Sequence, residues 1–262
     1  MKHSLTRLTL GAAALAGALA FPSAFAADAK PTVVLVHGAF ADSSSWDGVA
    51  AKLEKDGYTV IGAANPLRSV KTDAASVASV LKSVNGPVVL VGHSYGGSVI
   101  SAAATGASNV KALVYVAAFA PEAGETAVGL SNKFPGSTLG PTLAPPVALA
   151  DGGKDLYIQQ SKFHSQFAAD VPEAKARLMA IGQRPVTDAA LNEASPAPAW
   201  KTIPSWFVFG KADKNIPLAS LEFMAKRANA RKTVVIDGAS HVVMTSHPTE
   251  VAKLIEEAAT AK

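Results

Sequence analysis

The sequence predicts an α/β protein with a mostly parallel, doubly wound sheet. Six short apolar runs recur along the chain, and segments with helical spacing of apolar residues separate them. Continuous apolar runs are typical of strands buried on both faces of a parallel sheet, because helices then cover both sides. A length of 262 residues suits one large domain and is ample for a buried core.

The individual elements follow from local patterns. Predicted strands lie at residues 32–36, 59–63, 88–91, 112–117, 206–209 and 233–236. Apolar residues share one helical face in the segments 49–53, 77–84 and 251–255. Asp73 and Pro248 lie near helix starts, where a cap or a fixed φ is favourable. Strands that alternate with helices predict the doubly wound arrangement.

One long segment, residues 121–204, interrupts this alternation. It is rich in Pro, Gly and Ala, and it has strand-poor patches such as residues 134–146. Two helical pieces are predicted near residues 156–168 and 172–181. Because loops this long inside a domain are usually functional, we expect a cap over a cleft. Its larger apolar side chains fit a lid or a core of the cap equally well: Leu156, Phe163, Phe167 and Met179.

The first 26 residues predict a secretory signal peptide. Lys2 and Arg7 precede an apolar stretch over residues 8–21, and Ala-Phe-Ala follows as a small-x-small cleavage signature. About 20 apolar residues are needed to span a bilayer, so this stretch is too short for an anchor. We expect cleavage after Ala26 and export to the periplasm or the medium. The mature domain is then residues 27–262, with no membrane attachment.

Composition excludes several classes of protein. A hydrophobic content of 49% excludes a disordered chain, and the absence of cysteine excludes a disulfide-stapled mini-protein and a Cys-zinc domain. The formal charge is +4, and loss of Lys2 and Arg7 with the signal peptide lowers it to +2. No run of five basic residues occurs, which argues against nucleic acid as a partner. The sequence does not define an oligomeric state.

A nucleophile is predicted at Ser94. The apolar run 88–91 leads directly into Gly-His-Ser-Tyr-Gly, and a segment of small, helix-tolerant residues follows. In this strand–turn–helix context the motif G-x-S-x-G strains the backbone at the serine, and the glycines leave room for the turn. The hydroxyl is thereby lifted above the strand end, close to a helix N-terminus. A Gly-Ser turn alone is common, so it is the flanking strand and helix that favour the catalytic interpretation.

A serine hydroxyl near neutral pH needs a base to take its proton and a third group to hold that base. Asp213 follows the predicted strand 206–209, and His241 lies in a loop after the strand 233–236. The carboxyl ends of parallel strands meet at one sheet edge, so these side chains can converge with Ser94. The chain order of serine, acid and histidine is typical of one class of serine hydrolases.

Other ionisable residues compete for these roles. Asp237 lies four residues before His241 and is an alternative acid, but its position favours pairing with the loop backbone. Asp213 is favoured because it directly follows a strand end. A substrate contact stays open for His164, which lies in the predicted cap. Two further histidines have other expected roles: His93 is expected to make a structural hydrogen bond, and His247 to be a surface residue at a helix start.

Catalysis at a carbonyl also needs donors for the developing oxyanion. One is the backbone N–H after the nucleophile, which belongs to Tyr95. The other is expected from the His-Gly-Ala-Phe loop after the first strand. Gly38 permits a close backbone approach there, so the Ala39 N–H is the second predicted donor.

Four segments carry a resemblance to a known family: VLVHGAFADSSSWDGVA, LVGHSYGGSVI, GKADKNIP and GASHVVMTSHPTEVA. The mature chain resembles the α/β-hydrolase superfamily and, within it, bacterial esterases related to plant methyl esterases and hydroxynitrile lyases. The resemblance implies an α/β-hydrolase fold with a helical cap inserted between core strands. It also implies the triad roles of Ser94, Asp213 and His241, and it implies no metal or organic cofactor.

Two positions distinguish the subgroups. Hydroxynitrile lyases of this type usually carry threonine in the place of Gly38 and lysine directly after the catalytic histidine, where this chain has Val242. We therefore expect an exported serine hydrolase that cleaves small to medium, apolar carboxylic esters through an acyl-enzyme on Ser94. Three alternatives stay open: a cofactor-free haloperoxidase or perhydrolase, a hydroxynitrile lyase-like enzyme, and a hydrolase-fold binding protein.

Overall fold

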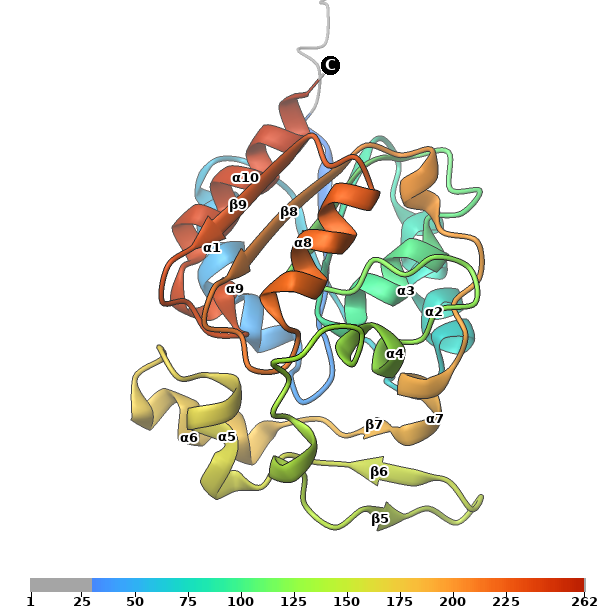
Figure 1. The fold of residues 1–262 in the computed structure, drawn as a ribbon. Helices are drawn as coiled ribbons and strands as arrows, with labels where there is room; N and C mark the ends of the chain where they lie inside the picture. Colours follow the sequence, from blue (N-terminus) through green and yellow to red (C-terminus); the bar gives the residue numbers. More distant parts are fainter. Residues whose placement is uncertain (1–29, 262) are drawn as a thin grey trace, which may run out of the picture.

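A six-stranded sheet forms the centre of the computed structural model, which describes residues 30–261 (Figure 1). The strand order is β2-β1-β3-β4-β8-β9, and all neighbouring strands are parallel. The strands are β1 (Thr32–Val36), β2 (Val60–Ala63), β3 (Val88–His93), β4 (Val110–Val116), β8 (Ser205–Gly210) and β9 (Lys232–Ile236). The predicted parallel sheet is confirmed, and each predicted strand falls on one of these elements.

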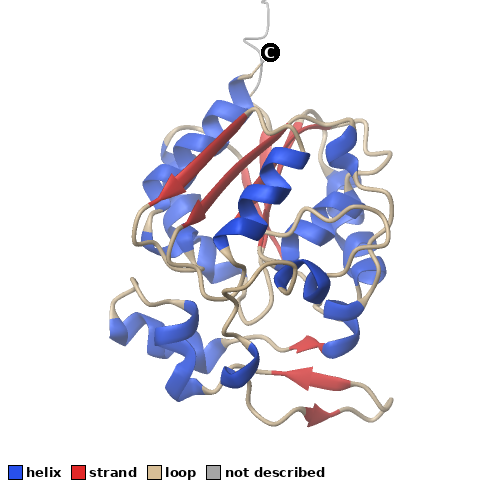
Figure 2. Ribbon diagram, in the orientation of Figure 1, coloured by secondary structure: helices blue, strands red, loops and turns tan. Residues whose placement is uncertain are grey.

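Helices cover both faces of this sheet (Figure 2). On one face α1 (Asp47–Lys55) packs against α10 (Pro248–Thr260), and α8 (Leu218–Arg227) lies on the other. The helices α2 (Val70–Ser83) and α3 (Tyr95–Ala103) also pack against each other. The predicted apolar stripes face the core, and these members of them are fully buried: Val49, Leu53, Val77, Val251 and Ile255.

Burial on both faces does not extend to the sheet edge. Every residue of β3 and β8 is buried, but β9 has exposed and half-buried positions, and Val235 is 36% exposed. The reason is that β9 is the last strand of the sheet and has a neighbour on one side only. The apolar run 233–236 predicted the strand correctly and its burial incorrectly.

A long segment between β4 and β8 lies below the sheet in Figure 1. Its helices are α4 (Ala127–Ser131), α5 (Gln160–Phe167), α6 (Glu173–Gly182) and α7 (Asp188–Asn192). It also contains an antiparallel sheet of β5 (Val147–Ala148), β6 (Lys154–Leu156) and β7 (Val186–Thr187). The sequence predicted the regions of α5 and α6 but not this sheet, because strands of two or three residues leave no periodic signal. We call residues 117–204 the cap segment.

The cap segment is attached to the loop before α2. The Arg68 guanidinium donates to Asp155 of β6 at 2.6 Å and to the carbonyl oxygen of Pro185 at 2.8 Å. In return, the Thr187 hydroxyl donates to the Arg68 carbonyl oxygen at 2.7 Å. Residues more than 80 positions apart in the chain are thereby tied together.

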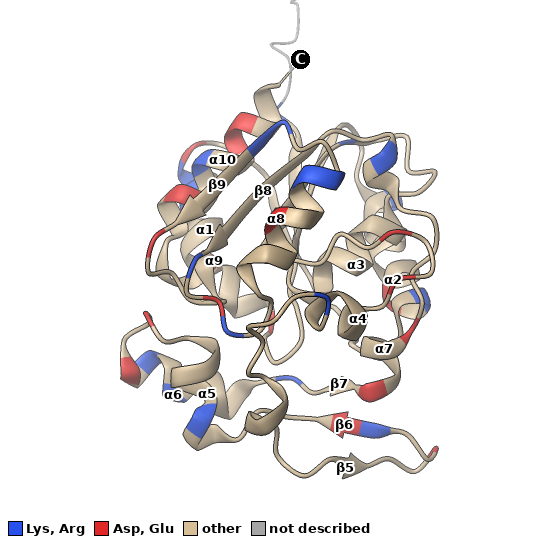
Figure 3. Ribbon diagram, in the orientation of Figure 1, with Lys and Arg blue, Asp and Glu red and all other residues tan. Residues whose placement is uncertain are grey.

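Charged residues of both signs are interspersed over the outer helices and loops (Figure 3). None of the helices within residues 30–261 is long and apolar enough to cross a membrane. The predicted signal peptide and its cleavage site after Ala26 lie outside the described residues.

Candidate active site

The elbow at Ser94 has the predicted strain. Ser94 joins β3 to α3 with φ 52° and ψ −123°, a left-handed conformation that is rare for residues other than glycine. The surrounding glycines permit it. A β-carbon added at Gly92 would lie 2.7 Å from the carbonyl oxygen of Gly96, and one at Gly97 only 2.2 Å from that of Phe119. Larger residues at these positions would therefore push the elbow away from its neighbours.

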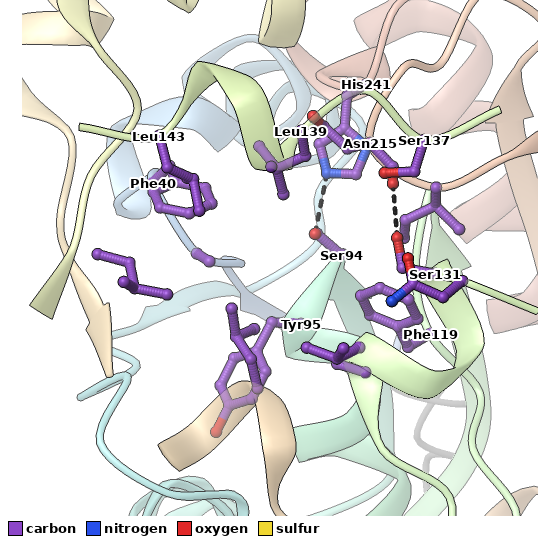
Figure 4. A pocket seen from close by; sticks show the side chains of 18 of the residues that line it. Phe40, Ser94, Tyr95, Phe119, Ser131, Ser137, Leu139, Leu143, Asn215 and His241 are labelled. Carbon is purple, nitrogen blue, oxygen red and sulfur yellow. Dashed lines mark hydrogen bonds between the residues drawn. The ribbon is translucent and has the colours of Figure 1, made fainter. Parts of the chain in front are cut away.

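Three predicted side chains meet at this elbow, and Figure 4 shows two of them, Ser94 and His241. The Ser94 Oγ lies 2.9 Å from His241 Nε2, and His241 Nδ1 lies 2.7 Å from Asp213 Oδ2. The other carboxylate oxygen of Asp213 accepts the backbone N–H groups of Asn215 at 2.8 Å and Ile216 at 3.0 Å. Because Nδ1 donates to a carboxylate, the lone pair of Nε2 faces the serine hydroxyl and can take its proton.

The alternative acid lies elsewhere. Asp237 forms an ion pair with Lys211 at 2.6 Å, and its side chain is 83% exposed. Its partner is thus a lysine ammonium in solvent rather than the loop backbone that its position favoured.

Two other histidines lie away from Ser94. His247 precedes the first turn of α10 and contacts the Ser246 hydroxyl at 2.9 Å. His164 contacts the Val171 carbonyl oxygen at 2.9 Å and does not line the cavity at Ser94.

His93 supports the backbone of the candidate base. Its buried ring lies with its centroid 4.8 Å from that of His241, and its Nε2–H donates to the His241 carbonyl oxygen at 3.1 Å. Burial, reinforced by the neighbouring His241, lowers the pKa of His93 well below its ordinary value of 6.5. A neutral ring holds the His241 loop without placing a second positive charge beside the base. The expectation of a structural hydrogen bond agrees with this contact.

A second buried histidine orients the loop after β1. Its partners define the tautomer: the Asn65 N–H donates to His37 Nε2 at 3.1 Å, so His37 Nδ1–H donates to the Gly38 carbonyl oxygen at 3.0 Å. Burial lowers the pKa of His37, which keeps the ring neutral. In a trans peptide the C=O and N–H groups point in opposite directions. Holding the Gly38 carbonyl therefore turns the Ala39 N–H the other way.

The two predicted oxyanion donors share the cavity with Ser94. Ala39 and Tyr95 both line it, and neither backbone N–H is hydrogen-bonded to any group within residues 30–261. Gly38 has no positive φ, so its role is spatial. A β-carbon there would lie 2.6 Å from that of Ser94 and 2.7 Å from the His93 carbonyl oxygen. This glycine lets the loop lie directly against the elbow.

The cavity at Ser94 has a volume of about 210 Å³. The cap segment contributes Leu156 and Phe167 to its wall, and Phe163 is fully buried with its ring 4.9 Å from that of Phe167. The described lining includes no Lys, Arg, Asp or Glu, so the cavity favours a neutral ligand. Among residues 30–261, no group of three or more His, Cys, Asp or Glu side chains is placed to hold a metal ion.

Sequence reasoning missed a buried pair next to the nucleophile. The Tyr95 hydroxyl donates to Asp73 Oδ2 at 3.0 Å, and burial together with this carboxylate raises the pKa of Tyr95. The Asp73 carboxylate, fully buried, also accepts the Arg68 backbone N–H. Asp73 lies in the first turn of α2 as predicted, but Ser69 caps that helix by accepting from Thr72 N. No local sequence pattern predicts a hydrogen bond between side chains of two different helices.

The chain matches the model of the "Alpha/beta hydrolase family" over residues 33–254, and it belongs to that family. Among curated proteins it is similar to the "Alpha/beta hydrolase nvfD" of Aspergillus novofumigatus (strain IBT 16806). The two are 26% identical over 250 residues, which cover 88% of this chain and 97% of the relative. It is also similar to an "Alpha-hydroxynitrile lyase" of Arabidopsis thaliana, at 28% identity over 84% of this chain and 93% of that protein.

Solved structures have the same fold. The structure of polyneuridine aldehyde esterase matches with a TM-score of 0.75 at 21% sequence identity, covering 87% of this chain and 98% of its own. A pyrethroid hydrolase from Sphingobium faniae JZ-2 matches with a TM-score of 0.70 at 22% identity, and the match covers 88% of this chain and 98% of that protein. These likenesses establish the α/β-hydrolase fold that the sequence predicted.

Gly38→Ala is expected to destabilise the protein, because its β-carbon would overlap both Ser94 and the His93 carbonyl. Overpacking of this kind costs about 1–3 kcal/mol in the free energy of unfolding. Gly62→Ala is the matched control, since its β-carbon would lie 3.4 Å from that of Ser43, an ordinary contact. Denaturant unfolding followed by circular dichroism measures both. Equal stability of the two variants would contradict the spatial role of Gly38.

Acid is expected to destabilise the fold through its buried histidines. Below about pH 6.5 the unfolded chain binds protons at His37 and His93, whose pKa values burial lowers in the folded state. Unfolding then takes up protons, so stability is lost as the pH falls below about 6.5 and is retained above that pH. His93→Gln removes one of these groups. The Tm deficit of that variant relative to the parent should therefore shrink between about pH 7.5 and pH 5. A Tm deficit that stays constant with pH would contradict the destabilising role of a buried neutral His93 in acid.

Proposed function

We propose that this protein is a serine hydrolase that cleaves carboxylic esters through an acyl-enzyme on Ser94. The hydrogen-bonded line from Asp213 through His241 to Ser94 carries the proposal, because it ends in a cavity beside two backbone N–H groups that have no partner among the described residues. A base, an oriented nucleophile and donors for an oxyanion are the parts that acyl transfer requires. Membership of the α/β-hydrolase family supports it.

In the acylation step, His241 Nε2 takes the hydroxyl proton as Ser94 Oγ bonds to the ester carbonyl carbon. The carbonyl oxygen becomes an oxyanion and accepts the N–H groups of Ala39 and Tyr95. Asp213 keeps the ring oriented and stabilises the imidazolium. When the intermediate collapses, the bond to the alcohol oxygen breaks and His241 gives that oxygen its proton.

In the deacylation step, water replaces the alcohol. His241 takes a proton from water as the water oxygen bonds to the acyl carbon, and a second tetrahedral intermediate forms. Its collapse breaks the bond to Ser94 Oγ, which receives the proton back from His241. The products are a carboxylic acid and the restored serine, with no metal or organic cofactor required.

The cavity and the neighbours both favour neutral, rather apolar esters. A volume of about 210 Å³ accommodates small to medium groups, and no charged side chain is available in the described lining to pair with a charged substrate. Two similar structures are named polyneuridine aldehyde esterase and a pyrethroid hydrolase, which supports ester cleavage as the reaction class. We further propose export, on the basis of the N-terminal signal pattern that ends at Ala26.

The Arabidopsis relative favours a second candidate, cyanohydrin cleavage. Two positions weigh against it. Gly38 provides no hydroxyl to hold a cyanohydrin, and Val242, which is fully buried, provides no ammonium beside His241 to stabilise departing cyanide. Cyanide release from mandelonitrile is the direct assay. Release at a rate comparable with ester hydrolysis would establish the second candidate.

Ser94→Ala is expected to abolish ester turnover and leave the fold intact, because the change keeps the β-carbon and removes only the hydroxyl that is hydrogen-bonded to His241. Hydrolysis of p-nitrophenyl acetate by the mature protein, together with circular dichroism, measures both effects. Loss of a triad nucleophile typically costs about 10⁶ in kcat. Activity within roughly tenfold of the parent would rule out a covalent intermediate on Ser94.

Asp213→Asn and Asp237→Asn form a matched pair, since both remove one carboxylate from a loop after a strand. Asparagine at position 213 misorients the His241 tautomer and is expected to cost roughly 10⁴ in kcat, as in serine proteases. The same change at position 237 removes only an exposed ion pair that solvent screens, and is expected to leave kcat within about twofold. A reversed ranking of the two rates would show that the acid is misassigned.

A further inference from the structure

The cavity at Ser94 has two chemically different walls. In Figure 4, Phe40 and Leu143 lie on one side of Ser94, and Ser131, Ser137 and Asn215 lie on the other. Hydrogen bonds join the chain segments that carry these three polar side chains, and both bonds end on the backbone of residues 214–215. The Ser131 hydroxyl donates to the Asn215 carbonyl oxygen at 2.9 Å, and Thr138, next to Ser137, donates its N–H to the Lys214 carbonyl oxygen at 2.9 Å.

The orientation of the Asn215 amide follows from its neighbours. Gln166 Nε2 donates to the Lys214 carbonyl oxygen at 2.9 Å, an atom that can only accept. The same NH₂ group donates to Asn215 Oδ1 at 2.8 Å, and the Thr138 hydroxyl donates to Gln166 Oε1 at 2.9 Å. These contacts show that the side-chain oxygen Oδ1 of Asn215 faces Gln166. The Asn215 NH₂ group must therefore point away from Gln166.

This NH₂ group has no hydrogen-bond partner within residues 30–261, although Asn215 is only 4% exposed and lines the cavity. Buried amide donors without partners are rare, because each one loses its water without compensation. Ser137, on the same wall, also has a side chain without a hydrogen bond to the described residues. A ligand that brings an acceptor to this wall compensates the Asn215 NH₂ group and can also accept from the half-buried Ser137 hydroxyl, whereas a hydrocarbon chain leaves the NH₂ group unpaired.

We propose that this polar wall is a subsite for a neutral hydrogen-bond acceptor of the substrate, separate from the scissile carbonyl. The inference rests on the proposed esterase function and narrows its substrate class. The substrate is an ester with one apolar arm, which packs on the wall of Phe40 and Leu143, and one arm that carries an ether, carbonyl or hydroxyl oxygen toward Asn215 and Ser137. A charged group is disfavoured because no Lys, Arg, Asp or Glu lies in the described lining.

Two pairs of isosteric esters test the subsite. The acyl pair is p-nitrophenyl butyrate and p-nitrophenyl methoxyacetate, and the alcohol pair is butyl acetate and 2-methoxyethyl acetate. In each pair an ether oxygen replaces one methylene, so shape is kept and one acceptor is added. The quantity compared is the ratio of kcat/KM for the ether to that for the alkyl ester. Dividing the ratio of a variant by that of the parent cancels the intrinsic reactivity of the esters.

In one of the two pairs, Asn215→Leu is expected to lower this ratio about tenfold, and Ser137→Ala to lower it several-fold. Ser137→Ala is the safer variant for folding, because the serine side chain makes no hydrogen bond to the part of the chain that the structure describes. Leu143→Ala is the matched control on the apolar wall, and its ratio should stay within about twofold of the parent.

The outcomes separate this inference from the function on which it rests. Ester turnover with ratios unchanged in both pairs, or lowered equally by Leu143→Ala, overturns the subsite and leaves the esterase standing. Absence of Ser94-dependent turnover of all four esters overturns the esterase, and the subsite falls with it. A ratio lowered by Ser137→Ala and Asn215→Leu alone supports the subsite, and the pair that responds identifies the arm that faces it.

Discussion

The left-handed backbone at Ser94 is the constraint on which the rest of the site depends. The Ser94 carbonyl oxygen accepts two N–H groups, from Gly97 at 2.9 Å and Phe119 at 3.1 Å, so it is bound both to its own helix and to the segment after β4. Such a conformation persists only where its surroundings over-determine it. Here those surroundings include Gly38 and Gly92, whose missing β-carbons let neighbouring backbones lie against the elbow. The hydroxyl is therefore held in position before any substrate arrives.

Two neutral histidines extend this rigidity to the groups around the nucleophile. His37 fixes the peptide that presents the Ala39 N–H, and His93 fixes the backbone that carries His241. Burial lowers the pKa of both, so each donates one hydrogen bond without bringing a positive charge near the site. In the proposed mechanism, the imidazolium on His241 then has Asp213 as its charged partner. Desolvation thus keeps the His37 and His93 rings neutral, so they serve to orient their neighbours, and the proposed proton transfer falls to His241.

The sequence allowed the sheet and the convergence of Ser94, Asp213 and His241 to be predicted because both depend on local patterns. Apolar runs gave the strands, and the position of a residue directly after a strand gave the edge at which Asp213 and His241 meet. The remainder of the site depends on pairs that are distant in the chain. Asn215 is oriented by Gln166, which lies 49 residues away, and Asp73 pairs with Tyr95 across two helices. Spacing along one element carries no information about such contacts, so the small cap sheet and the polar wall were missed.

The cap segment does more than line the cavity, because it is also hydrogen-bonded to the loops that carry Ala39, Asp213 and His241. Its Arg184 carbonyl oxygen accepts the Phe40 N–H at 3.0 Å in the loop of the oxyanion donors. Its Asp170 accepts the hydroxyl of Ser240, directly before the base. Its Gln166 side chain holds the loop that carries the acid. A substitution in the cap segment therefore acts on the positions of these groups as well as on the shape of the cavity, so under the proposed mechanism it is expected to change kcat together with substrate preference.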